Sequence, residues 1–324
     1  MGLSAGFINA HIAAWEARLN TPFQTYRAQW PSRLFHHAPV ENAALILKHG
    51  RLLSRIQSEG RRAVDVAPPD LIGSRTRPHE FARLYFRPRT PTQFLIEGIR
   101  KPSEYYQGKH APVLVMFVFD ARKVLALDEV RFSDANMQSQ WTTDGNTEAF
   151  FSGIDWQSVF HNSPTQERGI RRRRCAEVLA PSPLPLRDNL QWVICRSQAE
   201  RAMLLSALGN HASAWRSIVR VSDDMRVFER RYTYVDQVAL QEDGIVFSLH
   251  PRQDGQPISF KLRVWDSQDT RITDTAKDPM DPIPPGKVAW IKRQPLKSGA
   301  YTILIELETC RAYRARIELG DAIF

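Results

Sequence analysis

The most apolar run of the chain, residues 112–119, restricts the fold more than any other stretch. It reads Pro-Val-Leu-Val-Met-Phe-Val-Phe and contains no charged residue. Eight residues are typical of a strand and short for a helix. A run that is apolar at every position, rather than at alternate ones, suits a strand buried on both faces. We therefore predict an α+β fold whose sheet has this strand at its core.

Further strands and helices are predicted on both sides of this run. Apolar residues recur every three or four positions over residues 8–19, which predicts an amphipathic helix. Residues 34–38 predict a short strand, Pro39 a turn, and residues 40–49 a helix that stops at Gly50. More strands are expected at 82–86, 177–179 and 190–195, and a capping box of Ser197 and Glu200 predicts the start of another helix.

Beyond about residue 226 the sequence changes character. Short segments of alternating apolar and polar residues follow one another, with Gly and Pro turns between them, as is typical of a small immunoglobulin-like sandwich. A length of 324 residues lies between one large domain and two ordinary ones. We predict a mixed-sheet domain at 1–224 and an all-β sandwich at 225–324, with strands at 245–249, 258–265, 288–291, 301–307 and 313–319.

The charge balance favours an anionic partner. The formal net charge is +9 and the isoelectric point is about 9.7, mainly because of arginine. Such a balance suits a nucleic acid or a phosphate-bearing cofactor, although charge governs association and not fold. No uncharged apolar run is long enough to span a membrane, so we expect a soluble protein without a membrane partner.

The cysteines and the short motifs argue against several classes of protein. Cys175, Cys195 and Cys310 are an odd number, lie far apart and form no CxxC pair. This pattern favours neither a disulfide framework nor a zinc site, and a reducing cytoplasm is the expected compartment. The absence of HExxH, of paired-carboxylate metal spacing and of a Walker loop counts against metal hydrolases and nucleotide triphosphatases. We expect no metal site.

Four consecutive arginines, Arg171 to Arg174, lead into one carboxylate, Glu177. Val178 and Leu179 continue directly from Glu177 and Pro181 ends the run, so the segment predicts a short strand that begins with a carboxylate. A glutamate held on a sheet beside a concentration of positive charge is a candidate functional group. The alternative is an ordinary edge strand whose charged neighbours keep it soluble.

Two long stretches without periodicity are further candidates for function. Residues 55–81 are rich in Arg, Pro and Gly and predict a loop, and loops of this length are usually functional or mobile. Residues 132–168 mix polar residues with Trp and Phe. Such a segment suits contact with substrate, whereas the alternative is a surface excursion pinned by its own aromatic side chains.

Several short motifs of the first domain, taken in order, resemble one known family. They are similar to those of the DarT-type ADP-ribosyltransferases, toxins that attach ADP-ribose from NAD to bases of single-stranded DNA. The ordered series is more specific than any one motif and covers roughly residues 33–195. Its members are residues 34–36 with Asn42, 46–54, 84–91, 104–108, 132–136 and 174–179.

The resemblance implies a fold, a reaction and a catalytic residue. The fold is the mixed sheet with helices of the ADP-ribosyltransferases, and the enzyme is an NAD-dependent transferase of the glycosyltransferase class. Glu177 is implied as the catalytic glutamate. The chemistry is compatible, because loss of nicotinamide leaves positive charge on the ribose, which a carboxylate can offset.

The resemblance also implies residues that hold NAD. His36, Asn42 and Tyr85 are implied in the pocket for the nicotinamide riboside and its surroundings. The planar fork of arginine matches phosphate oxygens, so Arg89 and an arginine of the 51–62 stretch, with Arg62 as the candidate, are expected near the pyrophosphate. Arg89 is taken as the second catalytic residue.

Two other interpretations remain open at this point. The basic surface could hold single-stranded nucleic acid without any chemistry. Alternatively, the chain is another enzyme, either an NAD-using transferase that modifies RNA or a histidine-based phosphoesterase. For the first interpretation, the DarT-type one, the expected partners are single-stranded DNA, or RNA, and an antitoxin or macrodomain hydrolase that protects the producing cell.

Overall fold

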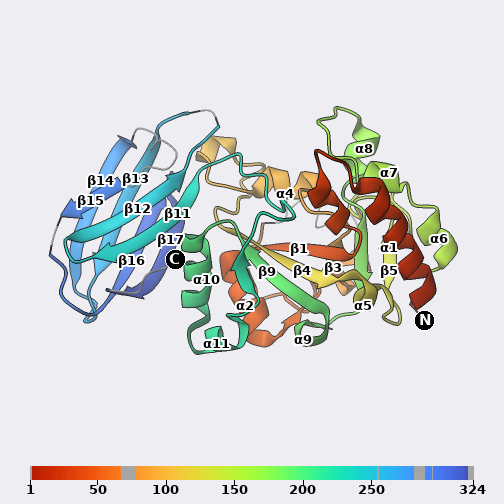
Figure 1. The fold of residues 1–324 in the computed structure, drawn as a ribbon, viewed down its shortest axis with the longest axis horizontal. Helices are drawn as coiled ribbons and strands as arrows, with labels where there is room; N and C mark the ends of the chain where they lie inside the picture. The colour runs from red at the N-terminus through yellow and green to blue at the C-terminus, as the bar shows by residue number, and fades with distance from the viewer. Residues whose placement is uncertain (1, 67–76, 254, 281–288, 294, 320–324) are drawn as a thin grey trace.

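The computed structural model describes residues 2–66, 77–253, 255–280, 289–293 and 295–319, and for 77, 277–280 and 289–293 it describes the backbone only. Two sheet systems lie side by side in it (Figure 1). The larger holds the N-terminal two thirds of the chain, and the smaller, drawn in blue, holds the C-terminal third. No helix in the described ranges combines the length and apolarity that a membrane crossing requires.

The predicted strand of residues 112–119 lies inside an eight-stranded mixed sheet. It forms β4 (Leu114–Asp120), in which residues 114–119 are each fully buried. Neighbouring strands are antiparallel except β9 and β10, which are parallel. The order is β10 (Val219–Val221), β9 (Leu190–Cys195), β4, β1 (Arg33–Pro39), β3 (Ala82–Tyr85), β7 (Glu177–Ala180), β5 (Arg131–Ser133) and β6 (Asp144–Gly145).

The helices begin and end where local chemistry predicts. Ser4 accepts a hydrogen bond from the Phe7 amide to cap α1 (Ala5–Leu19), and Gly50 ends α2 (Val40–His49) at a φ of 65°, which favours glycine. Ser197 caps α10 (Gln198–Leu208), as predicted, by accepting from the Glu200 amide, whereas the Glu200 carboxylate accepts from the Arg196 amide and does not complete the predicted capping box. The other helices are α4 (Pro91–Ile96), α5 (Ala121–Leu125), α6 (Glu148–Ser152), α7 (Trp156–Val159), α8 (Arg168–Arg173), α9 (Leu186–Asn189) and α11 (Ala212–Trp215).

Short elements complete the first domain. The strands β2 (Arg51–Leu52) and β8 (Leu184–Pro185) form a separate pair. The 3₁₀ turns are η1 (Thr25–Gln29), η2 (Arg77–Glu80), η3 (Pro102–Glu104) and η4 (Gly209–His211).

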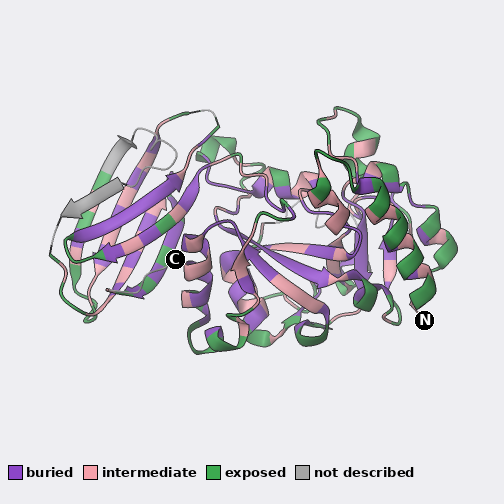
Figure 2. Cartoon of the chain, in the orientation of Figure 1, coloured by how far each residue is buried: buried purple, intermediate pink, exposed green. Residues whose placement is uncertain are grey.

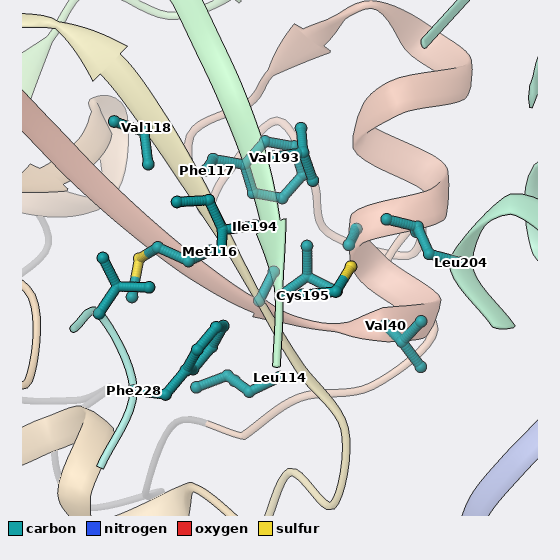
Figure 3. Packing of buried hydrophobic residues seen from close by; sticks show 14 of the residues in the cluster. Val40, Leu114, Met116, Phe117, Val118, Val193, Ile194, Cys195, Leu204 and Phe228 are labelled. Carbon is teal, nitrogen blue, oxygen red and sulfur yellow. The ribbon is translucent and has the colours of Figure 1, made fainter. Parts of the chain in front are cut away.

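The core of the first domain lies on both faces of the sheet. Val40 of α2 and Leu204 of α10 pack over Phe117 and Cys195, while Met116 and Val118 face the opposite side together with Phe228 (Figure 3). Burial is deepest along β4 and its neighbours, and the outward faces of α1 and α6 are exposed (Figure 2). The sheet-centred prediction is therefore confirmed.

The segment before Glu177 differs from the expected pattern in one respect. Arg171 to Arg173 belong to the short helix α8, and the strand β7 begins at Glu177 itself. Because β7 pairs with β3 on one side and β5 on the other, it is not an edge strand. The edge-strand alternative is therefore wrong, and the strand's position leaves the Glu177 side chain fully buried.

The C-terminal third is an all-β sandwich, as predicted. One sheet has the order β11 (Tyr234–Gln241), β12 (Gly244–His250) and β15 (Ala289–Arg293). Phe247 and Phe260 stack between the sheets, with ring centroids 5.3 Å apart. The sequence analysis had not singled out β11 and β14. The second sheet has the order β14 (Arg271–Met280), β13 (Ile258–Trp265), β16 (Ala300–Leu307) and β17 (Cys310–Glu318).

The connection between the sheet systems is packed rather than extended. The buried carboxylate of Glu97 accepts hydrogen bonds from the backbone amides of Glu229 and Arg230, at 3.0 and 3.2 Å. Val227 and Phe228 are buried nearby. Residues just beyond the predicted boundary at 224 therefore pack against the first domain.

Candidate active site

A cavity of about 640 Å³ opens beside β1 and β3, two interior strands of the mixed sheet. It is walled by β1, α2, the loop after β2, β3, α4 and α8. Asp65 is the one acidic residue among the described residues that line it. A positive, partly apolar cavity of this size suits a ligand that carries both phosphates and rings. The arginines of its wall are Arg51, Arg55, Arg61, Arg62, Arg83, Arg168, Arg171 and Arg172.

Glu177 lies immediately behind this wall. Its carboxylate forms a two-pronged ion pair with Arg83, whose Nε is 2.5 Å from Oε2 and whose Nη2 is 2.6 Å from Oε1. Arg83 lines the cavity, whereas the Glu177 side chain is fully buried. Burial opposes the charge of Arg83, but the charge and hydrogen bonds of Glu177 outweigh it and raise the pKa of Arg83. Glu177 is thus a fixed negative charge beside a positive cavity.

The backbone around Glu177 also fixes its carboxylate. The Glu177 amide donates to Ser133 Oγ at 2.9 Å, and the Met137 amide donates to Oε1 at 3.3 Å. Both partners belong to β5 and the turn that follows it. A buried carboxylate needs such donors because they replace the hydrogen bonds of water.

The polar segment 132–168 divides into two parts. Its beginning supports Glu177, and Asn136 and Gln138 line the cavity. Its later part forms α6 and α7, where Phe151 and Trp156 are buried with ring centroids 4.7 Å apart. The first part is therefore placed for the predicted substrate contact, which stays a prediction, and the second part is pinned by its own aromatic rings.

Two adjacent histidines of β1 line the cavity, and the sequence analysis had singled out only the first. His36 Nδ1 lies 3.0 Å from the carbonyl oxygen of Arg83. Because a carbonyl only accepts, Nδ1 carries the proton and Nε2 is left as an acceptor. Burial lowers the pKa of His36 to about 4 and that of His37 to about 3. Both rings are neutral at pH 7.

Tyr85 lies where the resemblance implied, in the cavity wall. It is the register partner of Glu177 on the adjacent strand, so the two side chains share one face of the sheet. The His37 ring stacks on it with centroids 5.5 Å apart. Burial, followed by the negative charge of Glu177, raises the pKa of Tyr85. The phenol therefore stays protonated and can donate to a ligand.

Asn42 and Arg62 also line the cavity. The Asn42 amide is occupied, because its Nδ2 donates to the Val64 carbonyl at 2.7 Å and its Oδ1 accepts from the Ala63 and Val64 amides. Asn42 therefore anchors the loop that carries Arg62. The Arg62 Nη2 lies 4.0 Å from Asp65.

Arg89 is not brought together with these residues. It does not line the cavity, its φ is 54°, and its Nη2 donates to Asn162 Oδ1 at 3.0 Å and Tyr26 Oη at 3.3 Å. Arg83, six positions earlier, occupies the place beside Glu177 that Arg89 was expected to share. The alternation of the strand 82–86 could have indicated Arg83, since it shares a face with Tyr85.

The sandwich reaches the rim of the cavity through Cys310. The Tyr105 hydroxyl lies 2.9 Å from Cys310 Sγ, and the Tyr105 ring stacks on His110 with centroids 4.3 Å apart. The next residue, Tyr106, lines the cavity. Arg311, beside Cys310, lies 3.8 Å from Glu41 of α2. The C-terminal domain thus supports two walls of the site.

A mixed sheet with a buried glutamate behind an arginine-lined cavity fits the ADP-ribosyltransferase class that the sequence motifs resemble. A family model described as "ssDNA thymidine ADP-ribosyltransferase, DarT" matches residues 35–226, more than half of the chain. The chain therefore belongs to the DarT family, and NAD is the ADP-ribose donor of this class. The family and the enzyme class predicted from the sequence are confirmed.

One relative and two solved structures are similar to this chain. A DNA ADP-ribosyl transferase of Thermus aquaticus (strain ATCC BAA-2747 / Y51MC23) is 26% identical over 168 residues, which cover 48% of this chain and 71% of that protein. The structure of Thermus sp. 2.9 DarT in complex with ADP-ribosylated ssDNA superposes with a TM-score of 0.51 at 21% identity, over 60% of this chain and 96% of that one. This likeness shows the fold. A second structure, of the same protein in complex with NAD+, gives a TM-score of 0.49 at 20% identity, over 60% and 97% of the two chains.

Proposed function

We propose that this chain transfers ADP-ribose from NAD to a thymidine base of single-stranded DNA, with Glu177 as the catalytic carboxylate. One observation carries the assignment of the residue. Glu177 is fully buried on an interior strand and forms an ion pair with Arg83, which lines the arginine-rich cavity. It lies within the part of the chain that the family model matches.

The cavity supplies the groups that hold the donor. Arginines of its wall match pyrophosphate oxygens, and apolar residues such as Leu45, Ile46 and Leu95 offer surface to the rings. Arg62 is the candidate for the pyrophosphate. His36 Nε2 is an acceptor and Tyr85 a donor, so together they can orient the hydroxyl groups and amide of the nicotinamide riboside.

Glu177 supplies the charge for the chemical step. The bond between nicotinamide and ribose breaks with its electron pair going to nicotinamide, and positive charge develops on the sugar. A carboxylate nearby stabilises that charge and can take the proton that the attacking base loses. Arg83 holds the carboxylate and faces the cavity, so a bound phosphate offers Arg83 a second partner and can free one side of Glu177.

The test combines labelled NAD with four homopolymeric DNA oligonucleotides and their RNA counterparts. Mass spectrometry then identifies the modified base. The expected result is an ADP-ribose adduct on oligothymidylate. An adduct on another base or on RNA would correct the acceptor and leave the reaction standing, whereas no adduct on any polymer would contradict the proposal.

We further propose that a neutralising partner accompanies the chain, either an antitoxin that blocks the site or a macrodomain hydrolase that removes ADP-ribose from DNA. The support is chemical, since a cell that makes an enzyme able to modify its own DNA needs protection from it. Co-expression of this partner with the chain should restore growth of the host cells. Restored growth with the adduct still on the DNA would exclude the hydrolase.

A further inference from the structure

Five arginines that do not line the cavity gather around the rings of Tyr26 and Trp30. The guanidinium carbons of Arg87 and Arg89 lie 5.0 and 5.6 Å from the Trp30 centroid, and that of Arg226 lies 4.7 Å from the Tyr26 centroid. Cation–π attraction holds Arg27, Arg87, Arg89 and Arg226 against these rings, whereas Arg174 joins the set through His161, to which Arg87 also bonds. The set, named the Tyr26 cluster, consists of Arg27, Arg87, Arg89, Arg174 and Arg226.

Positive charge in the cluster is poorly balanced. None of the ion pairs among the described residues involves these five arginines. Their hydrogen bonds go to neutral acceptors instead, such as the Phe160 carbonyl from Arg27 at 2.6 Å and Asn162 Oδ1 from Arg87 and Arg89 at 3.0 Å. Arg87 is buried and Arg27, Arg89 and Arg174 are half-buried. Charges withdrawn from water are ordinarily paired, so a set of this size without an ion-pair partner in the described ranges suits an anionic ligand.

The electrostatics agree with the geometry. Burial, and after it the charges of Arg174 and Arg89, lowers the pKa of Arg87 to about 9. Glu229 is the carboxylate nearby, and its own burial, followed by the charge of Glu97, raises its pKa to about 7. Half-ionised at neutral pH, Glu229 offsets only part of the cluster's charge.

Donors remain for a ligand. Among the described residues, Arg89 and Arg174 each donate side-chain hydrogen bonds through a single terminal nitrogen, Nη2. The buried Nε atoms of Arg27, Arg89 and Arg174 have no hydrogen-bond partner in the same part of the chain. The guanidinium of Arg226 is exposed and makes only its ring contact there. These Nε atoms are buried, so an incoming oxyanion would meet the Nη1 groups of Arg89 and Arg174 and the guanidinium of Arg226 instead.

Helix α8 joins the cluster to the cavity. Arg171 and Arg172 line the cavity, whereas Arg174, less than one turn further, bonds to His161 and the Ser163 carbonyl beside the cluster. One turn of helix advances about 5.4 Å, so the two positive regions are neighbours. The Arg173 side chain points to neither region, and its Nε lies 3.6 Å from Asp155 Oδ2. A strand of nucleic acid whose acceptor base enters the cavity has its flanking phosphates near this helix.

We propose that the Tyr26 cluster is a second anion site that binds a phosphate group of the single-stranded DNA acceptor outside the cavity. The proposal rests on the proposed function for the identity of the ligand. The chemistry that it recognises is a phosphate oxyanion, for which free inorganic phosphate is the other source. The site makes binding depend on the length of the acceptor.

The experiment compares an oligothymidylate trimer with a 12-mer in the full chain, through fluorescence anisotropy across a salt series. The variants are Arg226→Gln and Arg226→Glu, because Arg226 is exposed and holds no other element in place. Arg18→Gln and Arg18→Glu are the matched controls, since Arg18 is also exposed and also lies over one ring, 5.0 Å from Trp15. Thermal shifts with inorganic phosphate at constant ionic strength test whether the cluster binds free phosphate instead of DNA.

For the 12-mer, Arg226→Gln is expected to reduce the logarithmic salt slope by about 0.7, the value for one phosphate contact on a single strand. Arg226→Glu should weaken binding further, while the trimer serves as the internal reference. Inorganic phosphate could stabilise the native chain but not Arg226→Glu, while both proteins bind the 12-mer equally well. That result would assign the site to free phosphate. Identical slopes for Arg226 and Arg18 variants, with no phosphate effect, would overturn the proposal.

This outcome is separable from failure of the proposed function. If the native chain modifies no oligonucleotide yet its 12-mer binding depends on Arg226, the reaction is wrong and the anion site stands. If transfer to the trimer and the 12-mer proceeds equally well in the native chain and in Arg226→Glu, the reaction stands and the anion site is wrong.

Discussion

Arg83 and Glu177, 94 positions apart in the chain, are joined by two hydrogen bonds of 2.5 and 2.6 Å between adjacent strands. Arg83 lies opposite Leu179 in the register of β3 and β7, so Glu177 is its diagonal neighbour on the same face of the sheet. The pair connects the buried interior of the sheet to the cavity. Removing Arg83 and removing Glu177 should therefore have different consequences.

Removing Arg83 should destabilise the fold more than removing both partners. Arg83→Gln leaves the Glu177 carboxylate buried without its counter-charge, which costs about 3–5 kcal/mol in comparable pairs. The double variant Arg83→Gln with Glu177→Gln leaves no uncompensated charge. Urea denaturation of the four proteins in this cycle gives the coupling free energy. Equal stability of the Arg83→Gln and double variants would contradict the prediction.

Glu177→Gln should lose transfer while NAD binding survives. The amide keeps the shape of the side chain but supplies no negative charge, and loss of one electrostatic group of this kind typically lowers kcat about 10²- to 10³-fold. Adduct formation on oligothymidylate gives the rate and calorimetry gives the NAD affinity. The exposed Glu59→Gln is the control. Full activity of Glu177→Gln would remove Glu177 from the mechanism.

The four consecutive arginines should separate into residues that contact the substrate and residues that do not. Arg171 and Arg172 line the cavity, whereas Arg173 pairs with Asp155. The variant Arg171→Gln with Arg172→Gln should weaken oligonucleotide binding and flatten its salt dependence, by about 0.7 in slope for each phosphate contact. Arg173→Gln serves as the control in the same run and should leave the slope unchanged. Equal slopes for the native chain and both variants would mean that Arg171 and Arg172 contact no phosphate of the oligonucleotide.

Stability should fall as the pH drops below about 6.5. His36 and His37 have folded-state pKa values of about 4 and 3, below the ordinary 6.5, so between these limits the unfolded chain binds more protons. Unfolding free energy therefore increases with pH in this window, by up to about 1.4 kcal/mol per pH unit for each neutral histidine. Burial acts in the same direction on the pKa values of His11 and His110, which it lowers to about 4.

The measurement for this prediction is chemical denaturation between pH 4 and 7. His37→Gln cannot titrate and should show a shallower slope than the native chain, whereas the exposed His211→Gln should keep the native slope. A slope that His37→Gln leaves unchanged would mean that His37 is protonated in the folded chain.

The position at which the first domain is truncated should decide its stability. A chain that ends at Ser222 lacks the amides of Glu229 and Arg230 that bond to the buried Glu97, and it lacks the buried Phe228. A chain that ends at Thr233 keeps them. We expect the shorter form to be less stable by several kcal/mol, since the costs of an unsatisfied buried carboxylate and of a missing aromatic side chain add. Thermal unfolding of both forms measures the difference, and equal midpoints would place the domain boundary at 224 as the sequence predicts.

Local sequence chemistry was enough to predict the main elements, and the resemblance of the ordered motifs predicted the family. Residues 112–119 predict a buried strand because every position is apolar, and Gly50 and Ser197 mark helix ends because their chemistry acts on neighbouring backbone groups. Glu177 was singled out because a carboxylate opens an apolar run, and the strand does begin at Glu177, while its catalytic role stays a prediction. These signals are local, so no knowledge of distant contacts is needed to interpret them.

The choice of the arginine that accompanies Glu177, in contrast, depends on tertiary structure. Arg83 and Arg89 are both arginines of one strand and its turn, and composition does not distinguish them. The pairing of β3 with β7 places Arg83 diagonally opposite Glu177, while the positive φ of Arg89 directs the chain toward Tyr26 and Asn162. The side chains of Arg171 to Arg174 likewise point in three different directions, because a helix turns by about 100° at each residue. Strand register and helix rotation are set by non-local packing, which no single stretch of sequence contains.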